Sequence, residues 1–131
     1  MIGLDANILV RYLILDDPSQ AERAHDILEK QLSPSEPGYI SLVAMAETVW
    51  VLDSIYGIGR EDLARTIDRL LASENLSIQN EREVYLAMVM LESGVASFSD
   101  ALIGALGAWA GCSETLTFDR KAARLPSFRL A

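Results

Sequence analysis

The sequence predicts an α/β fold in three layers, with a central parallel sheet of four to five short strands between two layers of helices. Short apolar runs alternate with longer segments of helical periodicity along the chain, which is the pattern of strands joined by helical crossovers. The 131 residues contain no internal repeat and match the usual size of one domain. We therefore expect a single domain that spans residues 1–131.

Five short apolar runs are predicted as strands, and the segments between them as helices. The strands are expected at residues 1–5, 39–41, 76–78, 114–118 and 128–130. The helices are expected at residues 8–13, 19–32, 42–56, 60–72, 81–92 and 99–111. Asn7 is expected to cap the first helix, and Ser19 to open a capping box at the second.

Two of these helices have a distinctive composition. The helix at residues 42–56 is apolar on nearly every side, which predicts that it is buried. Glu47 lies in its middle, and a buried carboxylate needs a cation or a hydrogen-bond donor close to it. The helix at residues 99–111 is rich in small residues, so we expect it to pack closely against a sheet.

The charge is unevenly distributed along the chain. A formal net charge of -8 disfavours a general nucleic-acid binder. The segment after Asp119 differs, because it contains no acid and four basic residues, Arg120, Lys121, Arg124 and Arg129. On its own, such a segment is most simply a solvated terminal helix.

The sequence also predicts a cellular compartment. Cys112 is the one cysteine, so no internal disulfide can form. Asp5 and Arg11 interrupt the N-terminal apolar run, unlike the core of a signal peptide. No uncharged apolar run approaches membrane-spanning length, so we expect a cytoplasmic protein without a membrane partner.

Four acids, Asp5, Glu47, Asp100 and Asp119, form the candidate site. Each has a simple structural explanation when taken singly, such as a helix cap or a favourable charge at a helix start. Three of them lie where an apolar run meets a helix start, and in a parallel sheet such junctions share one edge. Glu47, on the first turns after the second strand, is expected near that edge too.

Carboxylates gathered in this way repel one another unless a cation neutralises them. An all-oxygen set suits Mg²⁺, with Mn²⁺ also possible, and argues against zinc. Mg²⁺ held by carboxylates is suited to phosphodiester hydrolysis, because it polarises the phosphate and lowers the pKa of a bound water. The one histidine, His25, lies on an amphipathic surface helix and is expected to be solvated.

With these residues in place, the chain resembles the PIN-domain nucleases, and within them the VapC toxins of type II (VapBC) toxin–antitoxin systems. The resemblance covers almost the full length. The segments that carry it, in chain order, are residues 2–13, 16–18, 40–41, 46–52, 98–103 and 117–124. Each segment is a weak match alone, whereas the ordered set is specific.

The resemblance implies a magnesium-dependent endoribonuclease. In the family, the acids that match Asp5 and Asp100 are the usual metal ligands, and those that match Glu47 and Asp119 complete the cluster directly or through water. Thr117 and Asn7 match polar positions that support the site. The sequence departs from the family at Ala6, where Thr or Ser is common, but no acid is lost, so we expect activity to survive.

The resemblance also implies how the chain acts and with what. Metal-activated water would attack an RNA phosphodiester in line and leave a 5′-phosphate and a 3′-hydroxyl. Arg11, Arg120 and Lys121 would hold the flanking phosphates. The expected partners are the RNA substrate, a VapB-type antitoxin that obstructs the site, and a second copy in a homodimer or a toxin–antitoxin hetero-oligomer. Trp50 and Tyr56 would contribute to such contacts or belong to the core.

Two other readings stay open at this point. A phosphoaspartyl phosphatase would need a second aspartate two residues after Asp5, where Asn7 stands, and a receiver domain would need a lysine near the last strand, whereas Lys121 lies beyond Asp119. The remaining alternative is a catalytically silent PIN-like binding module. Such degeneration normally removes acids, and all four are present.

Overall fold

A computed structural model describes all residues 1–131 as an α/β protein made of two compact units. Unit 1 comprises residues 1–58 and 69–79, and unit 2 comprises residues 59–68 and 80–131. Helix α4 (Arg60–Ala72) therefore contributes residues to both. No helix is both long enough and apolar enough to cross a membrane.

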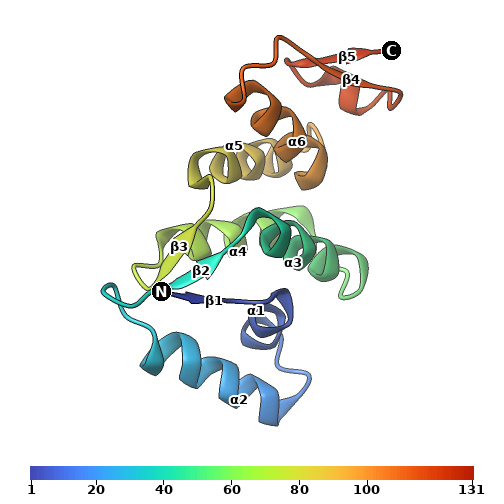
Figure 1. The fold of residues 1–131 in the computed structure, drawn as a ribbon. Helices are drawn as coiled ribbons and strands as arrows, with labels where there is room; N and C mark the ends of the chain where they lie inside the picture. Colours follow the sequence, from blue (N-terminus) through green and yellow to red (C-terminus); the bar gives the residue numbers. More distant parts are fainter. The chain divides into compact units, whose positions relative to one another are not determined.

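Unit 1 is built on a parallel sheet of three strands, in which β2 lies between β1 and β3 (Figure 1). The register pairs Ile2 with Gly38 and Ile40 with Ile78. Ile40 is fully buried, as expected for the central strand of a parallel sheet. The strand bounds are β1 (Ile2–Gly3), β2 (Gly38–Ile40) and β3 (Leu76–Ile78).

The helices of unit 1 begin at caps that differ from two of those predicted. Asp5, not Asn7, caps α1, and Asp17, not Ser19, caps α2 with its carboxylate 3.1 Å from the Gln20 amide. Pro18 takes the first helical position of α2, which pre-sets its φ and moves the start one residue upstream of Ser19. The bounds are α1 (Ala6–Leu13), α2 (Pro18–Asp26), its π-helical continuation η1 (Ile27–Gln31) and α3 (Leu42–Ser54).

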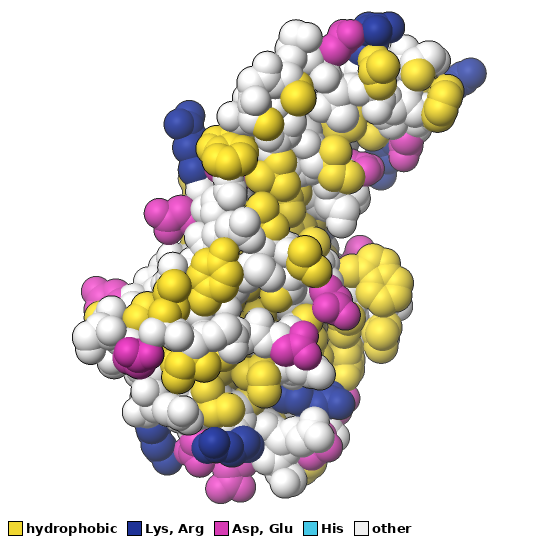
Figure 2. All heavy atoms as spheres, viewed as in Figure 1, with side chains coloured by type: hydrophobic (Ala, Val, Ile, Leu, Met, Phe, Trp, Pro, Cys, Tyr) yellow, Lys and Arg dark blue, Asp and Glu magenta, His cyan; other side chains and the backbone are white.

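The prediction that α3 is buried all round is wrong. Its inner face contains Met45, Thr48 and Leu52, but Val43 and Trp50 on the opposite face are 77% and 57% exposed. On the face of the molecule seen in Figure 2, exposed hydrophobic side chains likewise lie between Asp and Glu side chains. An apolar composition therefore did not mean burial, because one packed side is enough to hold this helix.

Unit 2 pairs two helices with a second parallel sheet, in which β4 lies beside β5. Helices α5 and α6 pack against each other, with Val84 and Phe98 among the buried residues. Gly104 and Gly107 of α6 allow the close approach predicted from its small residues, against Phe128 and Thr115 respectively. The bounds are α5 (Glu81–Glu92), α6 (Phe98–Trp109), β4 (Thr115–Thr117), the 3-10 turn η2 (Ala122–Arg124) and β5 (Phe128–Leu130).

The predicted class, α/β with parallel strands and helices between them, is confirmed. All five strands lie within one residue or two of the predicted runs, and every strand pair is parallel. Hydrogen bonds connect the strands as two sheets, one in each unit, where the sequence predicted one. Strands of two or three residues form few ladder bonds, so their sequences specify a strand without specifying its neighbour.

Gly104→Val should lower the free energy of unfolding by about 1–3 kcal/mol, because overpacking a filled contact costs that much. A Cβ at this position would overlap the ring of Phe128 and lie 3.1 Å from the Ser127 hydroxyl. The measurement is chemical denaturation of both proteins. Ala108→Val is the control, since it places the same side chain at an exposed position one turn later; equal losses in the two variants would contradict the packing argument.

Candidate active site

Asp5 lies where the first strand passes into the first helix. The Leu4 amide still bonds to the Tyr39 carbonyl at 2.9 Å, which extends the contact with β2 by one residue. The Oδ1 atom of Asp5 then accepts from the Ala6 amide at 2.7 Å. The carboxylate is exposed, and its Oδ2 atom has no protein donor. Asp5 is thus held in place through one oxygen while the other faces solvent.

Glu47 lies near the same edge of the sheet in unit 1. Strands β1 and β2 are parallel, so Asp5 and the start of α3 both follow the carboxyl ends of neighbouring strands. Helices α1 and α3 also pack together. The Glu47 side chain is exposed and has no ion pair. It therefore does not need the buried partner that the sequence predicted for it.

Asp100 lies in the first turn of α6 in unit 2. The Ser97 hydroxyl caps this helix by accepting from the Asp100 amide at 3.2 Å, and the spacing of the two residues is that of a capping box. The Asp100 side chain is half-buried and has no basic partner. A negative charge in a first helical turn is favourable by itself, so the fold tolerates this carboxylate without a cation.

Asp119 and Thr117 form a small hydrogen-bonded loop at the end of β4. The Thr117 hydroxyl accepts from the Asp119 amide at 3.0 Å. The Oδ1 atom of Asp119 in turn accepts from the amides of Lys121 and Ala122, at 2.8 and 3.2 Å. As at Asp5, one carboxylate oxygen accepts from backbone amides and the other has no protein donor.

The four acids divide evenly between the units. Asp5 and Glu47 belong to unit 1, and Asp100 and Asp119 to unit 2. Within neither unit do three or more acidic, histidine or cysteine side chains gather as a metal site. The meeting of all four acids therefore stays a prediction from the sequence.

The basic and polar residues predicted to support the site differ in whether another side chain of the protein already contacts them. Arg120 and Lys121 are exposed and form no ion pair, so both are available to an anion. Asn7 is also exposed and does not cap its helix. His25 is exposed but packs against the ring of Tyr12, with 4.5 Å between the ring centroids.

Arg11 lies in a cluster that the sequence did not predict. Its Nη1 atom donates to Asp16 at 2.9 Å and its Nε atom to Gln20 at 2.7 Å. The Tyr56 hydroxyl donates to the second oxygen of Asp16 at 2.6 Å, and it also accepts from Arg11. The hydrogen bond from Tyr56 and the charge of Arg11 hold the pKa of Asp16 below its usual value. Tyr56, at the end of α3, is a long-range partner that no local motif could reveal.

In Tyr56→Phe, the pKa of Asp16 should rise toward its usual value, because the strongest donor to its carboxylate is lost. A depressed pKa means that ionised Asp16 stabilises the fold at neutral pH, and that this stabilisation is lost as the pH falls through the folded-state pKa. In the variant the loss should be smaller and should be complete at a higher pH, because the folded-state pKa lies closer to the unfolded-state value. An NMR titration of the Asp16 carboxyl carbon measures this, with Tyr39→Phe as the control. An unchanged titration midpoint in Tyr56→Phe would contradict the assignment.

Comparison with known proteins assigns these residues to a family. The PIN domain family model matches residues 2–127, a stretch that contains all four acids. No curated protein matches the chain. PIN domains are generally nucleases that use divalent metal ions, which agrees with the carboxylates of Asp5 and Asp119 beyond strand ends and with a hydrolase acting on nucleic acids. The chain therefore belongs to the PIN domain family.

Proposed function

We propose that this protein is a Mg²⁺-dependent endoribonuclease and the toxin of a VapBC-type toxin–antitoxin pair. The observation that carries the proposal is the PIN domain match over residues 2–127, within which Asp5, Glu47, Asp100 and Asp119 are all present. The site would lie where these four carboxylates meet.

The donor chemistry of these residues fits a hard divalent cation. All four offer carboxylate oxygens, and the softer donors His25 and Cys112 have no part in the set. Asp5 and Asp119 each use one oxygen for backbone amides, which orients the carboxylate and leaves the second oxygen for the ion. This arrangement supports Mg²⁺, or Mn²⁺ in its place, as the cofactor.

Each residue has a distinct task in the proposed reaction. Asp5 and Asp100 would hold the ion, and Glu47 and Asp119 would complete its shell or orient the attacking water. When bound, the metal would supply an activated water and neutralise the charge that develops on the phosphate. The Thr117 hydroxyl keeps Asp119 in place by accepting a hydrogen bond from the Asp119 amide. The products would be a 5′-phosphate and a 3′-hydroxyl.

Substrate binding falls mainly to the basic segment that follows Asp119. Arg120 and Lys121 have no acidic partner and lie directly beside Asp119 in the chain, so each can contact a phosphate next to the scissile bond. Arg11 would first have to exchange Asp16 for a phosphate. We therefore give Arg11 a secondary part in binding and a larger part in fixing the α1–α2 connection.

The proposal includes protein partners as well as RNA. A toxin of this kind is expected to be held by a VapB-type antitoxin and to act as a homodimer or in a hetero-oligomer with it. Trp50 and Val43 support such contacts, because both are largely exposed on the outer face of α3 in spite of their size. The Tyr56 hydroxyl already donates to Asp16, so Tyr56 is a weaker candidate for contacts with a protein partner.

Asp100→Asn and Asp5→Asn should each reduce RNA cleavage by about a hundredfold or more, since a lost ligand charge removes several kcal/mol of transition-state stabilisation. Asparagine caps a helix as well as aspartate, so Asp5→Asn should preserve the fold. The measurement is cleavage of a mixed RNA pool in Mg²⁺, with sequencing of the product ends. Asp53→Asn, an exposed acid outside the four, is the control. Full activity in Asp100→Asn would remove this residue from the mechanism.

Expression of the chain without the neighbouring reading frame should arrest growth, and co-expression of that frame should relieve the arrest. Asp5→Asn should relieve it equally without the frame. If the chain proves inert to RNA and binds neither Mg²⁺ nor Mn²⁺ in a fluorescence titration, it is instead a binding module built on a PIN domain. Cleavage of RNA without toxicity would retain the nuclease and reject the toxin.

A further inference from the structure

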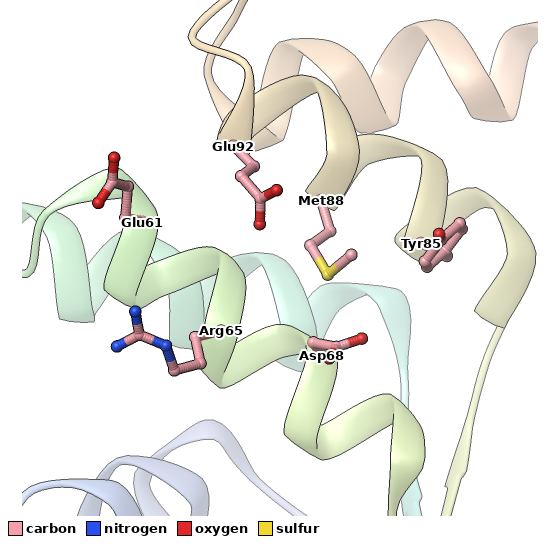
Figure 3. A pocket seen from close by; sticks show the side chains of 6 residues that line it. All are labelled: Glu61, Arg65, Asp68, Tyr85, Met88 and Glu92. Carbon is pink, nitrogen blue, oxygen red and sulfur yellow. The ribbon is translucent and has the colours of Figure 1, made fainter.

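A groove of about 430 Å³ lies between α4 and α5 in unit 2 (Figure 3). Its volume is within the range of grooves and pockets that bind ligands. One wall comes from α4 and the other from α5, and none of the four candidate catalytic acids contributes. The residues that line it are Glu61, Arg65, Asp68, Tyr85, Met88 and Glu92.

Each wall is a single helix face. Glu61, Arg65 and Asp68 recur at intervals of four and three residues, so they project from one side of α4. Tyr85, Met88 and Glu92 recur with the same helical spacing on α5. Figure 3 shows Met88 directed toward α4 between Glu92 on one side and Tyr85 on the other. The groove thus has an apolar centre and acids toward its ends.

The acidic side chains that line the groove are not neutralised by basic side chains of the same groove. Arg65 is its one cation, and its guanidinium is already 2.7 Å from Asp62, which lies outside the groove. Glu61, Asp68 and Glu92 form no ion pair. Three carboxylates therefore face the groove without a cation of their own.

The apolar surface in the groove suits a particular kind of cation. Tyr85 is 49% exposed, so its ring is accessible, and Met88 forms a nearly buried floor. A guanidinium is planar, stacks on an aromatic ring and bonds to a carboxylate through two parallel N–H groups. Its methylene stem can lie along a thioether such as that of Met88. A lysine ammonium would pair with the carboxylates, but it has neither the planar face that stacks on a ring nor the two parallel N–H groups.

We propose that this groove binds an arginine-bearing segment of a partner protein. Arginines of this segment would lie over Met88 and stack on Tyr85. They would pair with Glu61 and Glu92 at one end of the groove and with Asp68 at the other. Nucleic acid is a poor occupant, because its phosphates would meet three unpaired carboxylates. The proposal does not depend on the nuclease assignment, since it uses no residue of that site.

Binding of a fluorescein-labelled hexa-arginine peptide to the full chain, followed by anisotropy, tests the proposal. The Glu61→Gln/Glu92→Gln double variant should bind about tenfold more weakly, which corresponds to the loss of two partly exposed ion pairs. The Glu22→Gln/Glu74→Gln double variant removes the same charge from exposed positions of unit 1 and should change binding by less than about twofold. Thermal melts confirm that both variants are folded.

Tyr85→Leu separates stacking from charge. It should weaken binding of hexa-arginine several-fold and binding of hexa-lysine by a smaller factor, because the planar guanidinium stacks on the ring and gains more from it than an ammonium does. An equal loss of affinity in the two double variants would mean that the peptide responds only to the net charge of the protein, and this would overturn the proposal. Absence of any binding at low salt, or equal affinity for both peptides in every protein, would overturn it as well.

Discussion

Backbone amides held by aspartate oxygens fix the two strand ends on which the rest of the site depends. Asp5 accepts from the amide that opens α1, and Asp119 accepts from two amides that open η2. Each hydrogen bond satisfies a donor that a helix start leaves unpaired, and each places a carboxylate just beyond the carboxyl end of a parallel strand. The same contact therefore stabilises a chain reversal and presents an oxygen to solvent.

Because each aspartate binds backbone amides through one oxygen and exposes the other, a small acidic chain can keep carboxylates at its candidate site without burying a charge. None of the four acids forms an ion pair with a protein cation, and none is fully buried. Helix starts and backbone amides compensate part of their charge locally, at Asp5, Asp100 and Asp119. The remaining negative potential is what would attract a divalent cation, and through it the phosphate of a nucleic acid.

Several basic residues of the chain, unlike the four acids, are paired with side chains of opposite charge. Arg11 is engaged by Asp16 and Tyr56, and Arg129 by both oxygens of Glu114. These pairs connect neighbouring segments, since Arg11 lies between the α1–α2 connection and the end of α3. Arg120 and Lys121 remain unpaired, and so do the acids of the groove between α4 and α5. Unpaired charges of opposite sign thus mark two separate surfaces, one suited to an anion and one to a cation.

Local chemistry in the sequence was sufficient for the strands and for the Ser97 cap, because each depends on residues that are neighbours in the chain. The alternation of strands with helices was sufficient for the parallel α/β class. Local chemistry was insufficient for two helix starts. Asp5 caps α1 in place of Asn7, and Asp17 caps α2 in place of Ser19. Composition was also a poor guide to the burial of α3. How many neighbouring elements a helix packs against depends on the tertiary structure, and it cannot be predicted from the residues of that helix alone.

By itself, the sequence determined that Asp5 and Asp119 follow strands and that carboxylate oxygens suit a hard cation, since residue type and order are enough for both. Only the tertiary structure decided that Glu47 is exposed, that Tyr56 and Arg11 share Asp16, and that α4 and α5 enclose an acidic groove. The physical reason is that exposure and pairing arise between segments far apart in the chain. Their contacts form through packing, which no local pattern encodes.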